Sequence, residues 1–259
     1  MKPRLDEWNF LKEFTHARVA MGRAGNAVPT QAWLAFKTAH ARARESVWKE
    51  IDFQQLEDEI RSHGLASRQV QSQCKSKKEF LLEPDKGRRL CEESRNALQK
   101  SISGKDIYDC ILLLGDGLSA EALHKNGIPF LTEFVEVQKR SGLKWGPLIL
   151  ARYARVALGD ELAVLLKSKS IMTLIGERPG LASSESLSLY YTYQVGSQTT
   201  DADRNCISNI HSEGLSPRGA AQMAFYLLEQ SFKKKLSGVN LKVEYPSSFS
   251  LPAAVDPSR

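Results

Sequence analysis

The sequence predicts an α/β protein whose sheet is doubly wound and mainly parallel, preceded by a helical N-terminal region. Three short apolar runs, at 107–114, 147–151 and 171–175, alternate with segments of helical periodicity in the second part of the chain. Parallel strands need crossover connections, which are usually helices, so this alternation is typical of a parallel sheet. The first part of the chain has helical periodicity and no convincing strand.

The bulk composition is that of an ordinary globular protein. The chain has 259 residues, of which 42% are hydrophobic and 25% charged, enough for one large or two modest domains. No apolar run approaches the roughly 18 residues that a membrane span needs. The N-terminus has a basic start without the apolar core of a signal peptide. We therefore expect a cytoplasmic protein that makes no membrane contact.

Cysteine and histidine spacings indicate no metal centre. Cys74, Cys91, Cys110 and Cys206 lie far apart and form no C-x-x-C pair, and the five histidines show no ligand spacing. The sequence therefore predicts reduced thiols and no protein-bound metal. Taken alone, Cys206 is most simply a small buried hydrophobe.

The net charge of +6 is unevenly placed. Residues 1–105 contain 20 Lys and Arg against 14 Asp and Glu, whereas residues 106–259 contain 16 of each. A basic region can contact nucleic acid or an acidic protein, or simply be solvated. Because no aromatic interleaving or nucleic-acid motif accompanies the charge, a solvated surface is the simplest interpretation and no nucleic-acid partner is expected.

Residues 1–105 are predicted to form a helical region. Apolar spacing and helix-favouring residues indicate helices over 32–44, 53–63 and 88–101. The polar segment 67–78 has too few apolar residues to specify a core. It is therefore expected to be a flexible connection or an exposed helix.

The first strand of the predicted sheet leads into a glycine loop. The run 107–114 ends at Gly115-Asp116-Gly117, and a helix over 120–125 follows and is closed by Gly127. Glycine lets a ligand approach the backbone, and a helix N-terminus favours an anion such as a phosphate. The signal is weak because the full G-x-G-x-x-G fingerprint is absent.

Residues 106–245 are expected to form a Rossmann-like domain. Residues 246–259 are rich in Ser and Pro and are expected to form a disordered tail. After Pro129 a helix is expected, then either a strand at 147–151 or a helix continuing through Val156, and a helix from 160 to 167. The remaining elements expected in this domain are a strand at 171–175, a short helix and a strand within 183–193, a turn-rich segment at 199–210, and a long helix from Pro217 to Gly238.

Glu177 is the first candidate for a ligand contact. The apolar run 171–175 stops at Gly176, and Glu177-Arg178-Pro179-Gly180 follows. Ligands of open α/β sheets bind in the crevice beyond the carboxyl ends of the strands, where Glu177 is expected. The competing interpretation is that Glu177 and Arg178 form a solvated pair in a tight turn.

Several of these segments resemble the small subunit of ethanolamine ammonia-lyase, an adenosylcobalamin-dependent enzyme, over nearly the whole chain. GERPGL at 176–181 and RNCISNI at 204–210 are the most specific segments. The others lie at 17–30, 39–44, 84–90, 115–119 and 155–160.

The resemblance implies a heteromeric carbon–nitrogen lyase, active only as a complex of several heterodimers with a large subunit. The large subunit would hold ethanolamine and the catalytic groups, with no catalytic residue in this chain. Adenosylcobalamin (coenzyme B12) would lie between the subunits and support radical deamination of ethanolamine to acetaldehyde and ammonia. The basic N-terminal region would supply much of the large-subunit contact. The sequence leaves open enclosure in a bacterial microcompartment.

Carried over by position, the cobalamin contacts fall on Val156, Glu177 and Cys206. A carboxylate can accept hydrogen bonds from the amide side chains of the corrin. The Gly115-Asp116-Gly117 loop is a secondary candidate, for the phosphate of the nucleotide tail. No D-x-H-x-x-G motif is present, so the cofactor is expected to bind base-on, with its own dimethylbenzimidazole on cobalt.

The alternatives come from other functional classes. A stand-alone nucleotide-binding α/β module would bind through the same glycine loop. A hydrolase lacks G-x-S-x-G and any nucleophile, base and orienter set. An RNA-binding protein rests only on the N-terminal charge.

Overall fold

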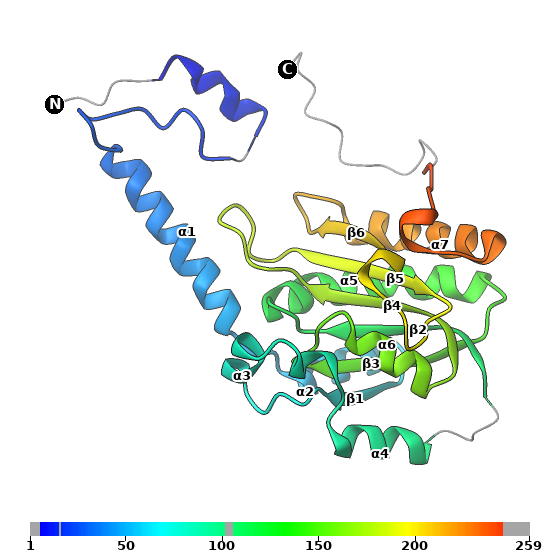
Figure 1. Ribbon diagram of the computed structural model, residues 1–259. Coiled ribbons are helices and arrows are strands. Elements are labelled where there is room, and N and C mark those ends of the chain that lie inside the picture. The colour runs from blue at the N-terminus through cyan, green and yellow to red at the C-terminus, as the bar shows by residue number, and fades with distance from the viewer. Residues whose placement is uncertain (1–5, 16, 102–105, 246–259) are drawn as a thin grey trace.

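A computed structural model describes residues 6–15, 17–101 and 106–245, and shows a single six-stranded sheet with helices (Figure 1). The strands are β1 (Ser67–Gln71), β2 (Tyr108–Gly115), β3 (Trp145–Arg152), β4 (Ser168–Gly176), β5 (Leu187–Tyr193) and β6 (Arg204–Ile210). Their order is β1-β3-β2-β4-β5-β6. The first four are parallel, and β5 and β6 continue the sheet in antiparallel fashion. The predicted α/β class is confirmed, with a mixed, mostly parallel sheet.

The α-helices are α1 (Thr30–Trp48), α2 (Phe53–Ser62), α3 (Lys77–Leu82), α4 (Glu92–Ser101), α5 (Ala120–Arg140), α6 (Leu158–Leu165) and α7 (Pro217–Lys234). Short 3-10 helices are η1 (Glu7–Glu13), η2 (Lys86–Arg88), η3 (Asp201–Asp203) and η4 (Gly238–Asn240). Among these described helices, none combines the length and apolar character needed to cross a bilayer.

The sheet is buried on both faces at its centre. In β2, Leu112 and Leu114 belong to one apolar cluster, shared with α2, α5 and α7, whereas Ile111 and Leu113 belong to another, shared with α4 and α6. Successive side chains of a strand point to opposite faces, so an unbroken apolar run is what a central strand requires. The predicted strands 107–114, 147–151 and 171–175 are confirmed as parts of β2, β3 and β4.

The prediction that residues 67–78 form a flexible connection or an exposed helix was wrong. Residues 67–71 form β1, which pairs with β3 at the sheet edge, and α3 begins at Lys77. Val70 is the only apolar side chain in β1, so no period of two was visible in the sequence. β1 is therefore defined by its backbone pairing with β3 and not by a pattern of apolar side chains.

Two further expectations about the sheet edge were wrong. Residues 183–186 contain no helix, and the segment predicted to be turn-rich, 199–210, contains β6. Of the β6 side chains, Ile207 and Ile210 are buried and most of the others are polar. That composition resembles a loop, although it belongs to a strand with only one buried face.

α5 is one helix where two were predicted, on either side of Pro129. Proline in a helix interior costs about 3 kcal/mol because it removes a hydrogen bond and crowds the preceding turn. Leu123, Phe130 and Phe134 lie on both sides of Pro129 and are almost fully buried. Burial of these three side chains stabilises the continuous helix by more than Pro129 destabilises it. The long helix predicted after Ser216 is confirmed as α7, capped by Ser216.

α1 extends away from the sheet, with η1 near its far end (Figure 1). Its C-terminal end is anchored by Ser46, whose hydroxyl lies 3.0 Å from the Ser119 hydroxyl and 3.0 Å from the Ser184 carbonyl. Along the rest of the helix, Trp33 and Leu34 are 48% and 59% exposed. We call η1 and α1 the N-terminal arm.

The loops at the carboxyl ends of the parallel strands are joined by Asp116. This carboxylate is 2% exposed and accepts hydrogen bonds from the backbone amides of Tyr153 and Ala154, both at 3.0 Å, so the loop after β2 holds the loop after β3. Burial raises the pKa of Asp116, while nearby Lys77 and the backbone amides oppose the rise. The Lys77 ammonium is also buried and donates to the Gly117 carbonyl at 3.1 Å.

The loop after β2 also packs directly on the end of β4. Gly117 has φ of +53°, and a Cβ built there would lie 2.4 Å from the Gly176 carbonyl oxygen. The Leu118 amide donates to that same oxygen at 3.0 Å. Only glycine permits both this backbone conformation and this close approach.

Gly117→Ala is expected to lower the free energy of unfolding by about 3 kcal/mol, because backbone strain and a clash with β4 add together. Gly142→Ala is the matched control. Gly142 also has positive φ, +65°, but nothing lies within 4 Å of its Cβ position, so this change should cost only about 1 kcal/mol. Urea denaturation of both variants measures the difference. Equal costs would show that the approach to Gly176 does not constrain the loop.

Candidate functional site

An open groove lies beyond the carboxyl ends of the parallel strands. It consists of two adjoining hollows of about 400 and 1130 Å³, which share Arg155, Val156, Tyr190 and Cys206. We call the two hollows together the carboxyl-end groove. Loops after β2, β3 and β4 form part of its wall. Its size suits a large ligand better than a substrate the size of ethanolamine.

Strands β5 and β6 line the groove. Ser188 and Tyr190 of β5, with Cys206 and Ser208 of β6, are among its lining residues, whereas Leu187, Leu189 and Ile207 belong to the apolar cluster on the other face of the sheet. α5 and α7 pack on that other face. The groove surface is therefore a stretch of sheet with small or polar side chains, which can accept a broad, flat ligand.

The three residues predicted to contact cobalamin come together here. Val156 follows β3, Glu177 follows β4 and Cys206 lies in β6, and all three line the 400 Å³ hollow. They are separated by 21 to 50 residues in sequence, so the fold alone brings them together. Their role as cofactor ligands stays a prediction.

Glu177 is held firmly at the end of β4. Its Oε1 accepts hydrogen bonds from the Ser188 hydroxyl and, at 2.9 Å, from the backbone amide of Asn209. The carboxylate therefore joins β4 to β5 and β6. No hydrogen bond to Oε2 comes from the described residues, and no ion pair there joins Glu177 to Arg178. The solvated-pair interpretation is therefore wrong. A fixed carboxylate with one oxygen to spare is suited to accept a hydrogen bond from a ligand.

Cys206 is a free thiol, and its residue is exposed on the groove. Desolvation raises the pKa of this thiol, although hydrogen bonds with Ser188 and Tyr190 oppose the rise. Cys206 is therefore a neutral thiol at pH 7. The expectation that it is simply a small buried hydrophobe was wrong on the burial, because the residue is exposed.

The glycine loop is less open than the sequence suggested. Both oxygens of Asp116 accept backbone amides, and Ser119 at the start of α5 is fully buried. The Ser119 hydroxyl accepts the Ala122 amide at 3.1 Å and lies within hydrogen-bond distance of the Ser184 carbonyl. Gly117 and Leu118 line the groove, but protein groups cap the N-terminus of α5, so the loop lacks the open anion site expected of it.

Apart from Glu177, the charged residues of the groove were not predicted from the sequence. Two of its carboxylates, those of α6, are each paired with an arginine. Asp160 accepts two hydrogen bonds from Arg204, at 2.7 and 2.6 Å, and Glu161 is paired with Arg95. In contrast, Arg155 and Arg178 make no ion pair with any carboxylate of the described chain. The sequence offered one signal, that Arg155 stands a few residues after a predicted buried strand, beside Val156.

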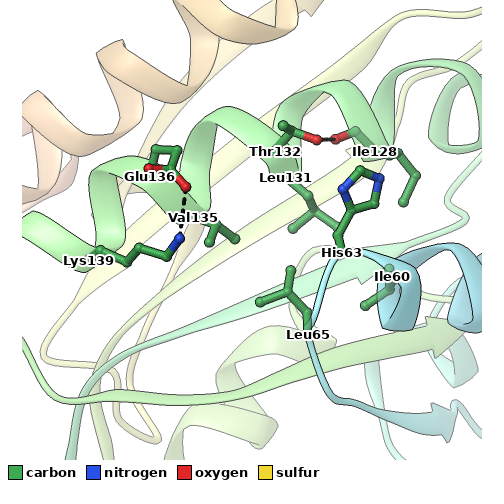
Figure 2. Close-up of a pocket in the computed structure, with 9 residues that line it drawn as sticks. All are labelled: Ile60, His63, Leu65, Ile128, Leu131, Thr132, Val135, Glu136 and Lys139. Atoms are coloured by element: carbon green, nitrogen blue, oxygen red, sulfur yellow. Dashed lines mark hydrogen bonds and ion pairs between the residues drawn. The ribbon is translucent and has the colours of Figure 1, made fainter.

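Another hollow, of about 90 Å³, lies between α2 and α5 (Figure 2). Ile60, Leu65 and Leu131 are among its lining residues. At its rim, the Thr132 hydroxyl donates to the Ile128 carbonyl at 3.0 Å, and Lys139 pairs with Glu136 at 2.8 Å. None of the predicted ligand residues lines this hollow. The Thr132 hydroxyl and the Lys139 and Glu136 side chains are already paired with other groups of α5.

Comparison with known proteins gives a consistent result. The family model described as ethanolamine ammonia-lyase light chain matches residues 5–242. A small subunit of ethanolamine ammonia-lyase from Pseudomonas fluorescens is 43% identical over 238 residues, which cover 92% of this chain and 86% of the relative. One from Rhodopseudomonas palustris is 42% identical over 240 residues, which cover 93% of this chain and 91% of the relative.

The family model spans nearly the whole chain, including the loops that bring Val156, Glu177 and Cys206 together. The resemblance found in the sequence is confirmed. The chain belongs to the ethanolamine ammonia-lyase light-chain family, whose members are the small subunits of that enzyme.

Proposed function

We propose that this chain pairs with the large subunit of ethanolamine ammonia-lyase and binds adenosylcobalamin in the carboxyl-end groove, at the interface between the two. The pair would deaminate ethanolamine to acetaldehyde and ammonia. Family membership supports the enzyme assignment, and the term small subunit implies a large one. The observation that supports the site most directly is the convergence of Val156, Glu177 and Cys206 on one hollow.

The groove residues fit a corrin cofactor. Ser188, Cys206 and Ser208 give a surface of small side chains against which a planar macrocycle can lie. The spare oxygen of Glu177 can accept a hydrogen bond from a corrin amide. We propose that the cofactor binds base-on, because the sequence contains no D-x-H-x-x-G motif.

The topology gives a physical reason for this location. We infer that β2, α5, β3, α6 and β4 form a Rossmann-like, doubly wound unit, in which β3 and β4 flank β2 on opposite sides. α5 and α6 belong to apolar clusters on different faces of the sheet. Loops diverge at such a switch point, and ligands of open α/β sheets bind there.

The proposal assigns this chain a binding role. When bound, the cofactor supplies the radical chemistry, while the protein provides binding, orientation and exclusion of water. Glu177 would orient the cofactor through its fixed carboxylate, and Val156 would contribute an apolar contact. Ethanolamine and the groups that act on it would belong to the large subunit, so no catalytic residue is proposed here.

The activity test compares this chain alone with this chain co-expressed with the large subunit. Acetaldehyde formation from ethanolamine and adenosylcobalamin is expected only for the pair. A well-folded pair that forms no acetaldehyde would contradict the enzyme assignment, and a stand-alone nucleotide-binding module would then be the hypothesis to test.

Glu177→Gln is expected to weaken cobalamin binding by the two-subunit complex about tenfold. Glutamine retains one oxygen for Ser188 and Asn209 but replaces the spare acceptor with a donor. Absorbance titration with cyanocobalamin measures the change. The control is Glu136→Gln, an exposed carboxylate beside the other hollow, which should bind as the wild type does. Equal affinities for wild type and Glu177→Gln would remove Glu177 from the site.

The N-terminal arm is the part of the chain that we propose contacts the large subunit. An isolated helix is marginal in water, and tertiary packing normally stabilises it. Here α1 contacts the rest of the chain mainly at one end, and its exposed Trp33 and Leu34 resemble the apolar anchors of a protein interface.

Replacing Trp33 and Leu34 by alanine is expected to weaken association with the large subunit tenfold or more, an order of magnitude typical of apolar anchors. Analytical ultracentrifugation of the mixed subunits measures it. Val239→Ala removes an apolar side chain that is even more exposed, at 71%, from the opposite end of the chain and should leave association unchanged. Full assembly of the double variant would place the interface elsewhere.

A further inference from the structure

Arg155 occupies the junction of the two hollows and is held in place from several sides. Its backbone amide donates to the Gly87 carbonyl at 2.8 Å, and one guanidinium nitrogen donates to the Phe80 carbonyl at 3.1 Å. The guanidinium carbon lies 4.3 Å from the centre of the Phe80 ring. The Nε atom is buried and has no hydrogen-bond partner among the described residues. Arg155 is therefore a fixed cation whose donors the protein leaves partly unused.

Among the described residues, no carboxylate forms an ion pair with Arg155. Desolvation, together with the charges of Arg88 and Arg178, lowers the pKa of Arg155, although Cys74 and Asp116 act in the opposite direction. Asp160 and Glu161, the nearest acids on the wall formed by α6, are already paired with Arg204 and Arg95. A partly desolvated cation beside further cations is costly unless an anion joins it.

We propose that Arg155 binds the phosphodiester of the nucleotide arm of cobalamin, which deepens the proposed function and rests on it. The peripheral side chains of the corrin end in neutral amides, so the phosphodiester is the one anionic group that the cofactor brings to the groove. Arginine suits this role because its fork of donors matches phosphate oxygens and its planar face stacks on an aromatic ring. Arg178 adds positive charge to the same anion site, whereas the charge of Arg88 is partly offset by its ion pair with Asp85 at 3.6 Å.

Three ligands separate the phosphate from the rest of the cofactor: cyanocobalamin, cobinamide phosphate, and cobinamide, which has no phosphate. Arg155→Met in the two-subunit complex is expected to weaken binding of the first two about 10- to 100-fold and to leave cobinamide unchanged. Arg155→Lys should fall between, because it keeps the charge without the fork. Arg140→Met, which removes an exposed charge at the end of α5, should have no effect.

Equal losses for all three ligands would assign Arg155 to shaping the groove and overturn the phosphate contact, as would undiminished cobalamin binding by Arg155→Met. A wild-type complex that fails to bind cobalamin would instead refute the proposed function itself. The salt dependence of the wild-type complex is a test that needs no variant. The affinity for cobalamin should fall as the potassium chloride concentration rises, whereas the affinity for cobinamide should not change. An equal fall for both ligands would contradict the proposal.

Discussion

The carboxyl-end groove depends on one buried carboxylate. Asp116 directly follows β2 and accepts hydrogen bonds from the backbone amides of Tyr153 and Ala154. These bonds fix the position of the loop before α6, which contains Arg155 and Val156. The adjoining Gly117 packs on Gly176, which places the start of the Glu177 loop relative to the same point. A charge buried at this depth is tolerated only when several groups stabilise it, and the backbone amides and Lys77 do so. Loops from three strands thus act as one rigid wall.

The antiparallel strands β5 and β6 complete the site in a different way. In a wholly parallel sheet, helices would cover both faces of these positions. Here the sheet extends past α6 and leaves one face of β5 and β6 lined with serine, tyrosine and cysteine, while the other face packs under α5 and α7. The Asp160–Arg204 pair joins α6 to β6 and so fixes the width of the groove between helix and sheet. A ligand bound there meets a rigid wall on one side and a flat surface on the other.

The sequence predicted the parts of the fold that rely on local signals. Apolar runs identified β2, β3 and β4, and caps and periodicity identified α1, α2 and α7. It did not predict β1 and β6, because each has few buried side chains and is defined by backbone pairing with a distant strand. Val156, Glu177 and Cys206 came from family resemblance, and residue spacing alone supported only Glu177. The role proposed for Arg155 depends on which carboxylates form ion pairs with other residues. That pairing is set by the tertiary structure and could not be predicted from the sequence.

The raised thiol pKa at Cys206 has a chemical consequence for the durability of the site. Peroxides, disulfides and other electrophiles react with the thiolate, and a thiol that stays protonated at neutral pH is a poor nucleophile. Cys206 is exposed on a broad groove, where an ordinary cysteine would be vulnerable to sulfenic acid formation and to mixed disulfides. Because its pKa is raised, Cys206 keeps a small, uncharged side chain on the groove surface and offers little thiolate to such reagents.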